Sequence, residues 1–574
     1  MKKILIFAYL LLLLIWATGC KKYLDINSDP DTPQQPSNSS VLPQCLASIP
    51  TALQSDGGTY VAKYIQNWLT GSSGNQNAWD LQGYTWSSGT AAQTWQMTYY
   101  ALGNNLTYIM DNAMKQSLPE YMGVALALRA WSFQHTTDYN CDIPFYSAFN
   151  PNLSVFHYDS QDTIYRGIDS ICHAAISYLN QALTDPNSGS RLAIGDLVYS
   201  GNISQWKKFV YGILARNYNH LSNKSIYKPD SVIAFCDSSL ASANDDFDVP
   251  FDATQNGNAN YFGTYRNNMG TLRQSNYIVN LLDGLILAGD FTPANRDPRL
   301  SQMLVCSNDT TNGNGGYRGV DPGQGDPYYS LNSPSTYLVN GLPPTSGSAL
   351  TNYTNSKKKV PIAWGDSLYA NTAASNFSLS GGKYLFKNKA VFPVMTYAEI
   401  KFIKAEAEFK KGNKADAYIA YLAGINGHFD FINRNYSTIR GADNIYNVNQ
   451  ISAAQRTAYL TGHNVKQIAD SLHLTDIMLQ KYIAMWGWGF TESWADLRRY
   501  HYTDIDVETG QQVYKGFNFP VPFYANNNGL PVYRVRPHFT SEYTYDVNEL
   551  IRVGATTSTF HTLEMWFSKP DNDD

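Results

Sequence analysis

Apolar residues recur every three or four positions through much of the chain, the spacing that places them on one face of an α-helix. Between residues 164 and 182 this stripe is regular, and polar residues fill the positions between. Two further stripes have the same period, and Ser204 stands before the second as a candidate N-cap. These stripes, which predict a mainly α fold, are formed by Tyr121, Val124, Ala125, Leu128 and Trp131; by Ile164, Ile168, Ile171, Ala175, Tyr178 and Ala182; and by Trp206, Phe209, Val210, Ile213 and Asn217.

Two consecutive stripes near residue 410 predict a helical hairpin. Ile400, Ile403 and Ala407 lie on the first helix, and Gly412 is expected to end it. The next helix opens with Ala415, Tyr418, Ile419 and Leu422. Small residues at the crossing point make this pair similar to a tetratricopeptide-type hairpin.

The helical pattern lapses between about residues 251 and 389. This stretch is dense in Gly, Asn, Ser, Pro and Tyr, as in residues 312–317. A structureless insert of this length is unusual inside a compact domain, and the segment is too aromatic for a flexible linker. We therefore predict ordered loops and short elements laid over a helical scaffold, where binding groups are usually displayed.

The first twenty residues have the features of an export signal. Two lysines precede an apolar run over residues 4–16, which is too short to span a bilayer. Cys20 follows the small residues 17–19, as in a bacterial lipobox, and its thiol is the expected acylation site. A plain signal peptide with a coincidental cysteine is the alternative. The predicted organisation is a signal peptide over 1–19, a lipidated tether and lead-in loop over 20–45, and a helical domain over 46–574.

Composition narrows the classes of ligand. Net charge is −5 and only 16% of residues are charged, so the chain has no basic field to hold nucleic acid. With 43% hydrophobic and 14% aromatic residues, intrinsic disorder is excluded. The surface must be built largely from Asn, Ser, Gly, Thr and Tyr, which suits uncharged, hydroxyl-bearing ligands. The spacing of the other cysteines predicts mostly buried free thiols and no zinc site. These cysteines are Cys45, Cys141, Cys172, Cys236 and Cys306.

Motifs for enzymatic chemistry are missing from the sequence. It contains no HExxH, GxSxG or P-loop motif, and its ten histidines have no metal-ligand spacing. We therefore predict no catalytic residue, no metal and no cofactor. Glycosidase carboxylates have no fixed spacing, so a surface glycoside hydrolase stays open as an alternative.

Aromatic residues in loops are the candidates for ligand binding. A flat ring can stack on the apolar CH face of a pyranose while nearby amides satisfy its hydroxyl groups. Most of the many rings must nevertheless belong to the core, as we expect for Trp95 and Trp131. The predicted ligand-binding residues are Asn75, Asn77, Trp79, Tyr84 and Trp86 in one loop, Tyr265 and Arg266 in a second, Tyr317 in a third, and Trp364.

Several short motifs follow one another along the chain. They are Cys20–Asp25, Ala127–Trp131, Cys141–Pro144, Asp196–Tyr199 through Trp206 and Arg216, Asp297–Leu300, Tyr397–Glu399, Ala405–Ala407, Glu492–Arg499 and Glu564–Phe567. Taken in this order, they resemble the SusD/RagB-like family of outer-membrane lipoproteins of the Bacteroidota. Cys141 stands where the family's Gly-Asp-(Ile/Val)-Pro turn has glycine. The charged residues in the last helical motifs are interpreted as buried pairs that join helices.

The resemblance implies an α-rich fold in which tetratricopeptide-like helical hairpins carry a loop-rich face for the ligand. It also implies a partnership with a SusC-like TonB-dependent transporter. The expected protein is a nutrient-binding lipoprotein of the outer membrane, anchored through acylated Cys20 and facing the cell surface. Its cargo would be an oligosaccharide or, alternatively, a peptide, bound without covalent chemistry.

Overall fold

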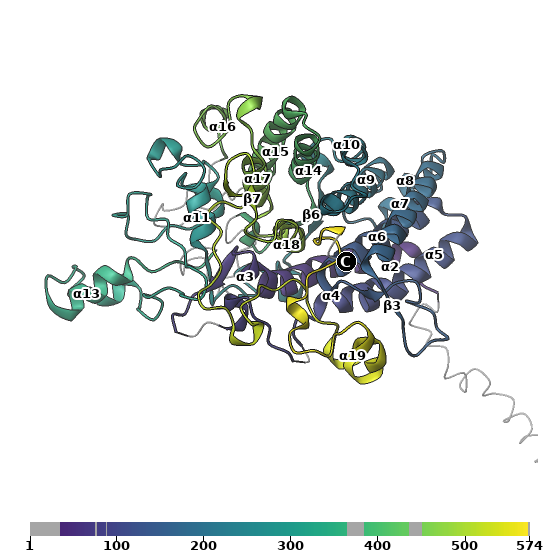
Figure 1. Cartoon of the computed structure of the whole chain (residues 1–574), viewed down its shortest axis with the longest axis horizontal. Coiled ribbons are helices and arrows are strands. Elements are labelled where there is room, and N and C mark those ends of the chain that lie inside the picture. Colours follow the sequence, from purple (N-terminus) through teal and green to yellow (C-terminus); the bar gives the residue numbers. More distant parts are fainter. Residues whose placement is uncertain (1–34, 75–76, 88, 364–383, 436–449, 572–574) are drawn as a thin grey trace, which may run out of the picture.

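The computed structural model describes residues 35–74, 77–87, 89–363, 384–435 and 450–571. Within these residues the chain is mostly helical, and its few strands are short. Figure 1 shows the long helices side by side in a curved row, with a loop-rich region and α13 (Gly347–Ser356) extending at one end. The prediction of a mainly α, tetratricopeptide-like scaffold is confirmed.

The row consists of helices that follow one another in the chain and pack in pairs. Successive pairs also contact one another, so that the hairpins form a continuous layer. The packed pairs are α6 (Pro119–Asn140) with α7 (Gln161–Ala182), α9 (Ile203–Asn219) with α10 (Pro229–Ser238), and α14 (Tyr397–Lys410) with α15 (Lys414–Asn435), and the row continues with α17 (Leu474–Met485) and α18 (Phe490–Arg499).

The three predicted stripes lie on α6, α7 and α9, and the predicted hairpin is formed by α14 and α15. Gly412 has φ +88° in the turn between them, a conformation that glycine adopts without strain. The cap of α9 differs from the prediction. Asn202, rather than Ser204, precedes the helix, and its side chain accepts a hydrogen bond from the backbone N–H of Gln205.

The fold begins earlier than the sequence suggested. Helix α2 (Asn38–Ala52) starts inside the segment expected to be tether and lead-in loop, so this boundary is corrected. Ser37 caps the helix, and Leu42, Cys45, Leu46 and Ile49 bury one face of it. The elements that follow are η1 (Leu53–Val61), α3 (Ala62–Tyr64), η2 (Ala78–Leu81), α4 (Gln93–Gln96), η3 (Met97–Asn104) and α5 (Asn105–Gln116).

The loop-rich insert is closed by a strand pair. β4 (Phe247–Pro250) runs antiparallel to β6 (Val391–Met395), so the chain leaves and re-enters the scaffold at one place. The described part of the insert has the ordered, short elements that were predicted. They are β5 (Leu272–Gln274), which pairs with β1 (Trp68–Thr70), together with α11 (Asn276–Leu282), α12 (Leu300–Met303) and α13.

The remaining short elements lie at the ends of the helical row and in the C-terminal region. None of the described helices is long and apolar enough to cross a membrane. These elements are the antiparallel pairs β2 (Ile143–Pro144) with β3 (Tyr158–Asp159) and β7 (Ile505–Asp506) with β8 (Gln511–Gln512), and the helices α8 (Ser188–Ala193), α16 (Ala453–Leu460), α19 (Phe539–Tyr545) and α20 (Val547–Arg552).

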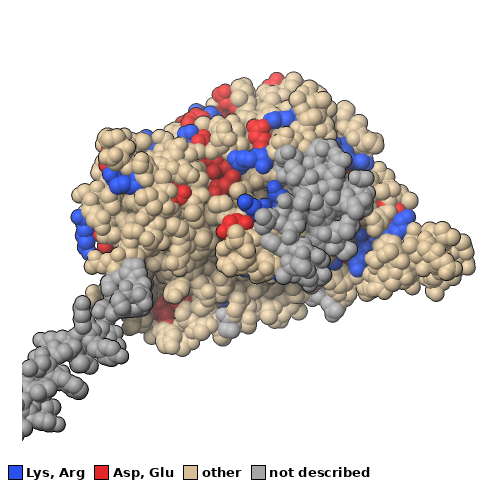
Figure 2. Space-filling view, turned by 180° about the vertical axis from the view of Figure 1, so that it is seen from behind, with Lys and Arg blue, Asp and Glu red and all other residues tan. Residues whose placement is uncertain are grey.

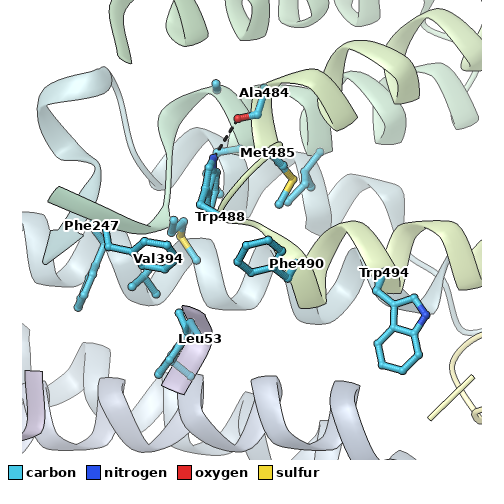
Figure 3. Packing of buried hydrophobic residues seen from close by; sticks show 14 of the residues in the cluster. Leu53, Phe247, Val394, Ala484, Met485, Trp488, Phe490 and Trp494 are labelled. Carbon is cyan, nitrogen blue, oxygen red and sulfur yellow. Dashed lines mark hydrogen bonds between the residues drawn. The ribbon is translucent and has the colours of Figure 1, made fainter. Parts of the chain in front are cut away.

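A continuous apolar core joins the scaffold to the loops. Figure 3 shows Leu53, Phe247, Val394 and Phe490 converging from four elements far apart in the sequence. The indole of Trp488 lies beside them, and its Nε1 donates to the carbonyl oxygen of Ala484 at 3.0 Å. The described cysteines from Cys45 to Cys306 carry free thiols, and all but Cys306 are buried, as predicted.

Buried charges also hold the helices together. Nε of Arg216 on α9 lies 2.5 Å from Oε1 of Glu399 on α14, and Arg499 on α18 pairs with Glu406 at 2.6 Å. These contacts confirm that the charged residues of the late motifs join helices. On the face shown in Figure 2, the remaining Lys and Arg side chains are interspersed with Asp and Glu, and most of the surface carries neither.

Candidate functional site

The loop predicted to present Trp79 and Tyr84 to a ligand packs them into the core instead. Trp79 is 4% exposed, and its ring centroid lies 4.3 Å from that of Tyr60 and 4.8 Å from that of Tyr84. Asn77 caps η2, and the Asp80 carboxylate accepts a hydrogen bond from the backbone N–H of Asn77. The rings of Tyr60, Tyr64 and Tyr84 surround the indole. The expectation that these two rings face a ligand was therefore wrong.

Trp86 is the ring of this loop that reaches the surface. Its side chain is 41% exposed, and its ring packs edge-on against Phe539 and Tyr543 of α19. The guanidinium group of Arg536 lies 4.7 Å from the indole centroid. Trp86 thus supports the outer side of α19.

The other predicted residues that the structure describes do not line one common hollow. Tyr265 and Arg266 are half-buried, and the guanidinium group of Arg266 stacks over the ring of Tyr261 at 5.0 Å. Tyr317 is buried in the core. Asn77 is exposed and serves as the cap of η2. Asn75 and Trp364 lie outside the described residues.

A hollow of about 750 Å³ opens on the side of α19 away from Trp86. Phe539 and Tyr543 face Trp86, whereas His538, Ser541 and Glu542 line the hollow. Side chains three or four positions apart share one face of a helix, which is why α19 separates the two sets. The remaining walls are formed chiefly by Trp95, Gln96, Tyr99, Tyr100, Asn104, Phe149, Asn150, Leu153 and Phe156.

The π-helix η3 supplies one wall. A π turn is wider than an α turn and is frequent at functional sites. Tyr100 is 81% exposed, whereas the hydroxyl of Tyr99 donates to the carbonyl oxygen of Pro144 at 2.7 Å. Gly103 leaves room for the opposite wall, because a Cβ there would lie 2.2 Å from Cε1 of Phe149. The wall therefore depends on a glycine.

The loop between β2 and β3 supplies the second wall. Phe149 has φ +65°, a left-handed conformation that bulky residues rarely adopt. The guanidinium group of Arg129 stacks 4.6 Å from its ring and donates to the carbonyl oxygen of Gly103 at 2.8 Å. Arg129 therefore ties the loop to η3 and has a structural role.

Glu542 is the acidic group of the hollow. Its carboxylate accepts hydrogen bonds from Tyr158 and Ser541, each at 2.7 Å. Burial raises the pKa of Glu542, and these two hydroxyl donors offset the rise only in part. Burial lowers the pKa of the neighbouring His538, whose Nδ1 lies 2.9 Å from the Ser541 hydroxyl, so its imidazole is neutral at pH 7.

The sequence pointed to Trp95 only as a core residue, and it did not single out Tyr99, Tyr100, Phe149, Phe156 or Glu542. Trp95 is indeed 7% exposed, but its accessible edge belongs to the hollow. Two features of the sequence could have pointed to the hollow: the adjacent tyrosines at 99 and 100, and the Pro-containing loop after residue 144. The sequence alone does not show that these two segments lie close together.

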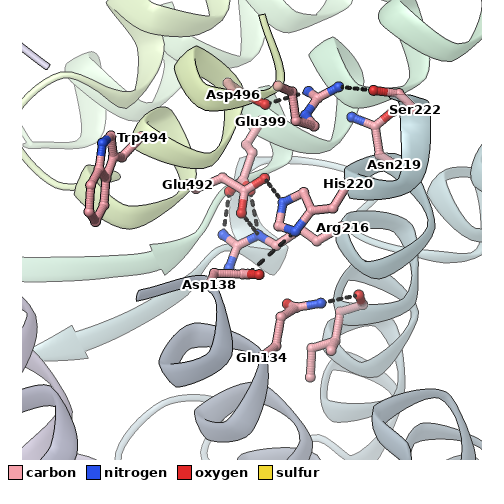
Figure 4. A network of polar contacts seen from close by, with 12 residues as sticks. Gln134, Asp138, Arg216, Asn219, His220, Ser222, Glu399, Glu492, Trp494 and Asp496 are labelled. Carbon is pink, nitrogen blue, oxygen red and sulfur yellow. Dashed lines mark hydrogen bonds and ion pairs between the residues drawn. The ribbon is translucent and has the colours of Figure 1, made fainter. Parts of the chain in front are cut away.

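A second cluster, formed by Asp138, His220 and Glu492, has the residue types of a metal site (Figure 4). Nε2 of His220 lies 2.9 Å from Glu492, and Nδ1 lies 3.4 Å from Asp138. Burial lowers the pKa of His220, but the two carboxylates outweigh it and raise the pKa to about 9. The imidazole and the two carboxylates thus form a buried ion-pair network.

The family is decided by comparison of the whole sequence. The profile of the SusD-like proteins, described as starch-binding and associating with the outer membrane, matches residues 30–521. The chain belongs to this SusD-like family. A search of curated proteins found no match.

Solved structures share the fold of this SusD-like chain. A SusD/RagB family protein from Bacteroides thetaiotaomicron is 19% identical, with a TM-score of 0.65 over 93% of this chain and 100% of that one. A chitin-binding SusD homolog from Flavobacterium johnsoniae is 16% identical, with a TM-score of 0.60 over 93% and 98%. A chitin-binding protein reaches 18% identity and a TM-score of 0.65 over 93% and 100%.

Proposed function

We propose that this SusD-like protein is a nutrient-binding lipoprotein of the cell surface that captures oligosaccharides for import. The observation that carries the proposal is the hollow of about 750 Å³ between η3, the 145–156 loop and α19. It has the size of a small-molecule site, and five aromatic side chains, those of Trp95, Tyr99, Tyr100, Phe149 and Phe156, are part of its lining. Acylated Cys20 would anchor the protein to the outer membrane, and a SusC-like TonB-dependent transporter would receive the cargo.

The chemistry of the lining suits a sugar. Tyr100 presents an exposed ring on which the CH face of a pyranose can stack. Gln96, Asn104 and Asn150 offer neutral donors and acceptors for hydroxyl groups at the same walls. Relatives of the same fold that bind chitin support a glycan as the cargo.

We propose that the protein binds its oligosaccharide without cleaving it. Hydrolysis of a glycosidic bond ordinarily uses two carboxyl groups that flank the bond. Among the described residues, Glu542 is the only carboxylate that lines the hollow. This geometry supports a protein that holds its cargo and releases it intact.

Replacing Tyr100 tests the site. We expect Tyr100→Ala to weaken binding of the recognised oligosaccharide by about tenfold, since one stacked ring contributes on the order of 1 kcal/mol. The melting temperature should stay unchanged because Tyr100 is 81% exposed. Isothermal titration against an oligosaccharide panel provides the measurement.

Tyr545→Ala is the matched control, since this tyrosine is 74% exposed on α19 and does not line the hollow. It should bind as the unmodified protein does. Equal affinities of the Tyr100 variant and the unmodified protein, or no heat from any oligosaccharide, would contradict the proposal.

A further inference from the structure

The hollow is unusual in its charge. Its one ionisable acid, Glu542, faces it from α19, and none of the described residues lining it is a lysine or arginine. His538, the remaining ionisable base at the wall, is neutral because burial lowers its pKa. With Glu542 ionised, the interior of the hollow carries a net negative charge, because no described lysine or arginine lines it.

Glu542 lacks a cationic partner within the described part of the chain. Its two hydrogen bonds come from the neutral hydroxyl groups of Tyr158 and Ser541, and no described cationic side chain acts on its carboxylate. A carboxylate offers about four acceptor positions, so two stay available. Asp546, one helical turn further along, adds repulsion that disfavours the ionised carboxylate. A cation bound beside Glu542 would therefore stabilise its ionised carboxylate more than a further neutral donor would.

Aromatic rings are stacked next to this carboxylate. Tyr158, which donates to Glu542, stacks against Trp95 with centroids 6.1 Å apart. Trp95 in turn lies 4.7 Å from Tyr99, and Tyr99 lies 6.1 Å from Phe149. The faces of aromatic rings attract cations, and of these rings Trp95, Tyr99 and Phe149 line the hollow. Rings and carboxylate therefore favour the same ligand group.

We propose that the hollow recognises a primary ammonium group, and that the cargo is an oligosaccharide containing amino sugars whose amines are free. This inference rests on the proposed glycan-binding function and makes its substrate class specific. The ammonium group donates to Glu542 while the sugar ring stacks on the exposed aromatic wall. A neutral sugar would leave the carboxylate without a cation, and an acidic sugar would be repelled by it.

The test compares three ligands of equal length: glucosamine oligosaccharides, their N-acetylated forms, and cello-oligosaccharides, which carry a hydroxyl group in place of the amine. Burial raises the pKa of Glu542, so titrations at several pH values between about 5.5 and 7.5 should bracket the range in which both the amine and this carboxyl group are charged. There the glucosamine form should bind at least about tenfold more tightly than either other form. This factor is what a charged hydrogen bond contributes at the lower end of its range.

Glu542→Gln should abolish that preference by weakening binding of the glucosamine form until it is no tighter than that of the cello-oligosaccharides. Glutamine can still accept from Tyr158, so the fold should be retained, as the melting temperature will show. Glu508→Gln is the matched control, because Glu508 pairs with Lys414 on the surface and does not line the hollow.

Equal binding of amine and hydroxyl forms, or a preference that survives Glu542→Gln, would overturn the inference and leave the glycan-binding function standing. Tight, Glu542-dependent binding of a lysine-containing peptide but of no glucosamine form would overturn the amino-sugar assignment. If no sugar binds, the proposed function fails and the inference fails with it.

Discussion

Cys141 occupies a backbone conformation that normally requires glycine. It follows α6 with φ +77° and ψ −115°, and its side chain is buried against Tyr165, Ala495 and Phe567. The turn into Asp142, Ile143 and Pro144 is therefore kept although a cysteine stands at the glycine position of the motif. Strain of this kind costs on the order of 1–3 kcal/mol, which the packing of the buried thiol offsets in part.

Two substitutions at this position separate strain from packing. Alanine keeps the Cβ and its strain, whereas glycine releases the strain, and both lose the thiol. We expect Cys141→Gly to be more stable than Cys141→Ala by about 1 kcal/mol, after allowing for the entropy that glycine gains on unfolding. Urea unfolding measures the difference, and a less stable glycine variant would show that the backbone is not strained.

At the scale of elements, helix positions follow from short-range pattern, whereas the site depends on how three elements meet. The stripes on α6, α7 and α9 gave those helices directly, because a 3.6-residue period is a local property. The start of α2 was missed, since its cap, Ser37, lies within a polar segment that looked like linker. The contact of Gly103 on η3 with Phe149 in the 145–156 loop has no local signature at all.

Gly103→Ala tests that contact. The added Cβ would lie 2.2 Å from the Phe149 ring, which must turn or shift the loop. We expect a loss of about 1–3 kcal/mol in the free energy of unfolding, typical of overpacking, together with weaker oligosaccharide binding because the wall is displaced. Chemical denaturation and titration measure the two effects.

Gly257→Ala is the control for this substitution, because nothing lies within 4 Å of a Cβ at that position. It should leave both stability and binding unchanged. A Gly103 variant that behaved in the same way would mean that Phe149 is free to move without affecting the hollow.

For the whole molecule, buried charges join helices that are distant in the sequence. His220 follows α9 and lies between Asp138 on α6 and Glu492 on α18, and Arg216 pairs with Glu399 on α14 beside it (Figure 4). The hydroxyl of Tyr165 on α7 lies 3.0 Å from Nδ1 of the same imidazole. Removing one member of such a network leaves another charge buried without its partner.

The network predicts how stability depends on pH. The pKa of His220 is raised from 6.5 to about 9 in the folded state, so its stabilisation is full below pH 6.5 and is lost as the pH rises through about 9. The loss amounts to about 3 kcal/mol of the free energy of unfolding. Urea unfolding at a series of pH values measures it.

His220→Gln removes the titrating group and keeps hydrogen-bonding capacity. Its stability should be lower near neutral pH and should vary less between pH 6.5 and about 9 than that of the unmodified protein. Parallel pH profiles of the two proteins would show that another group is responsible for the dependence.

The sequence by itself determined the helical scaffold, the loop-rich insert and the motifs of the family, because helical period, capping and turn chemistry act between residues close in the chain. Only the tertiary structure decided which rings face solvent. Trp79 and Tyr100 are both aromatic residues in polar surroundings, yet one is 4% and the other 81% exposed. Burial depends on segments that arrive from elsewhere in the sequence, here Tyr60 and Tyr64 around Trp79, and the 145–156 loop and α19 around the hollow.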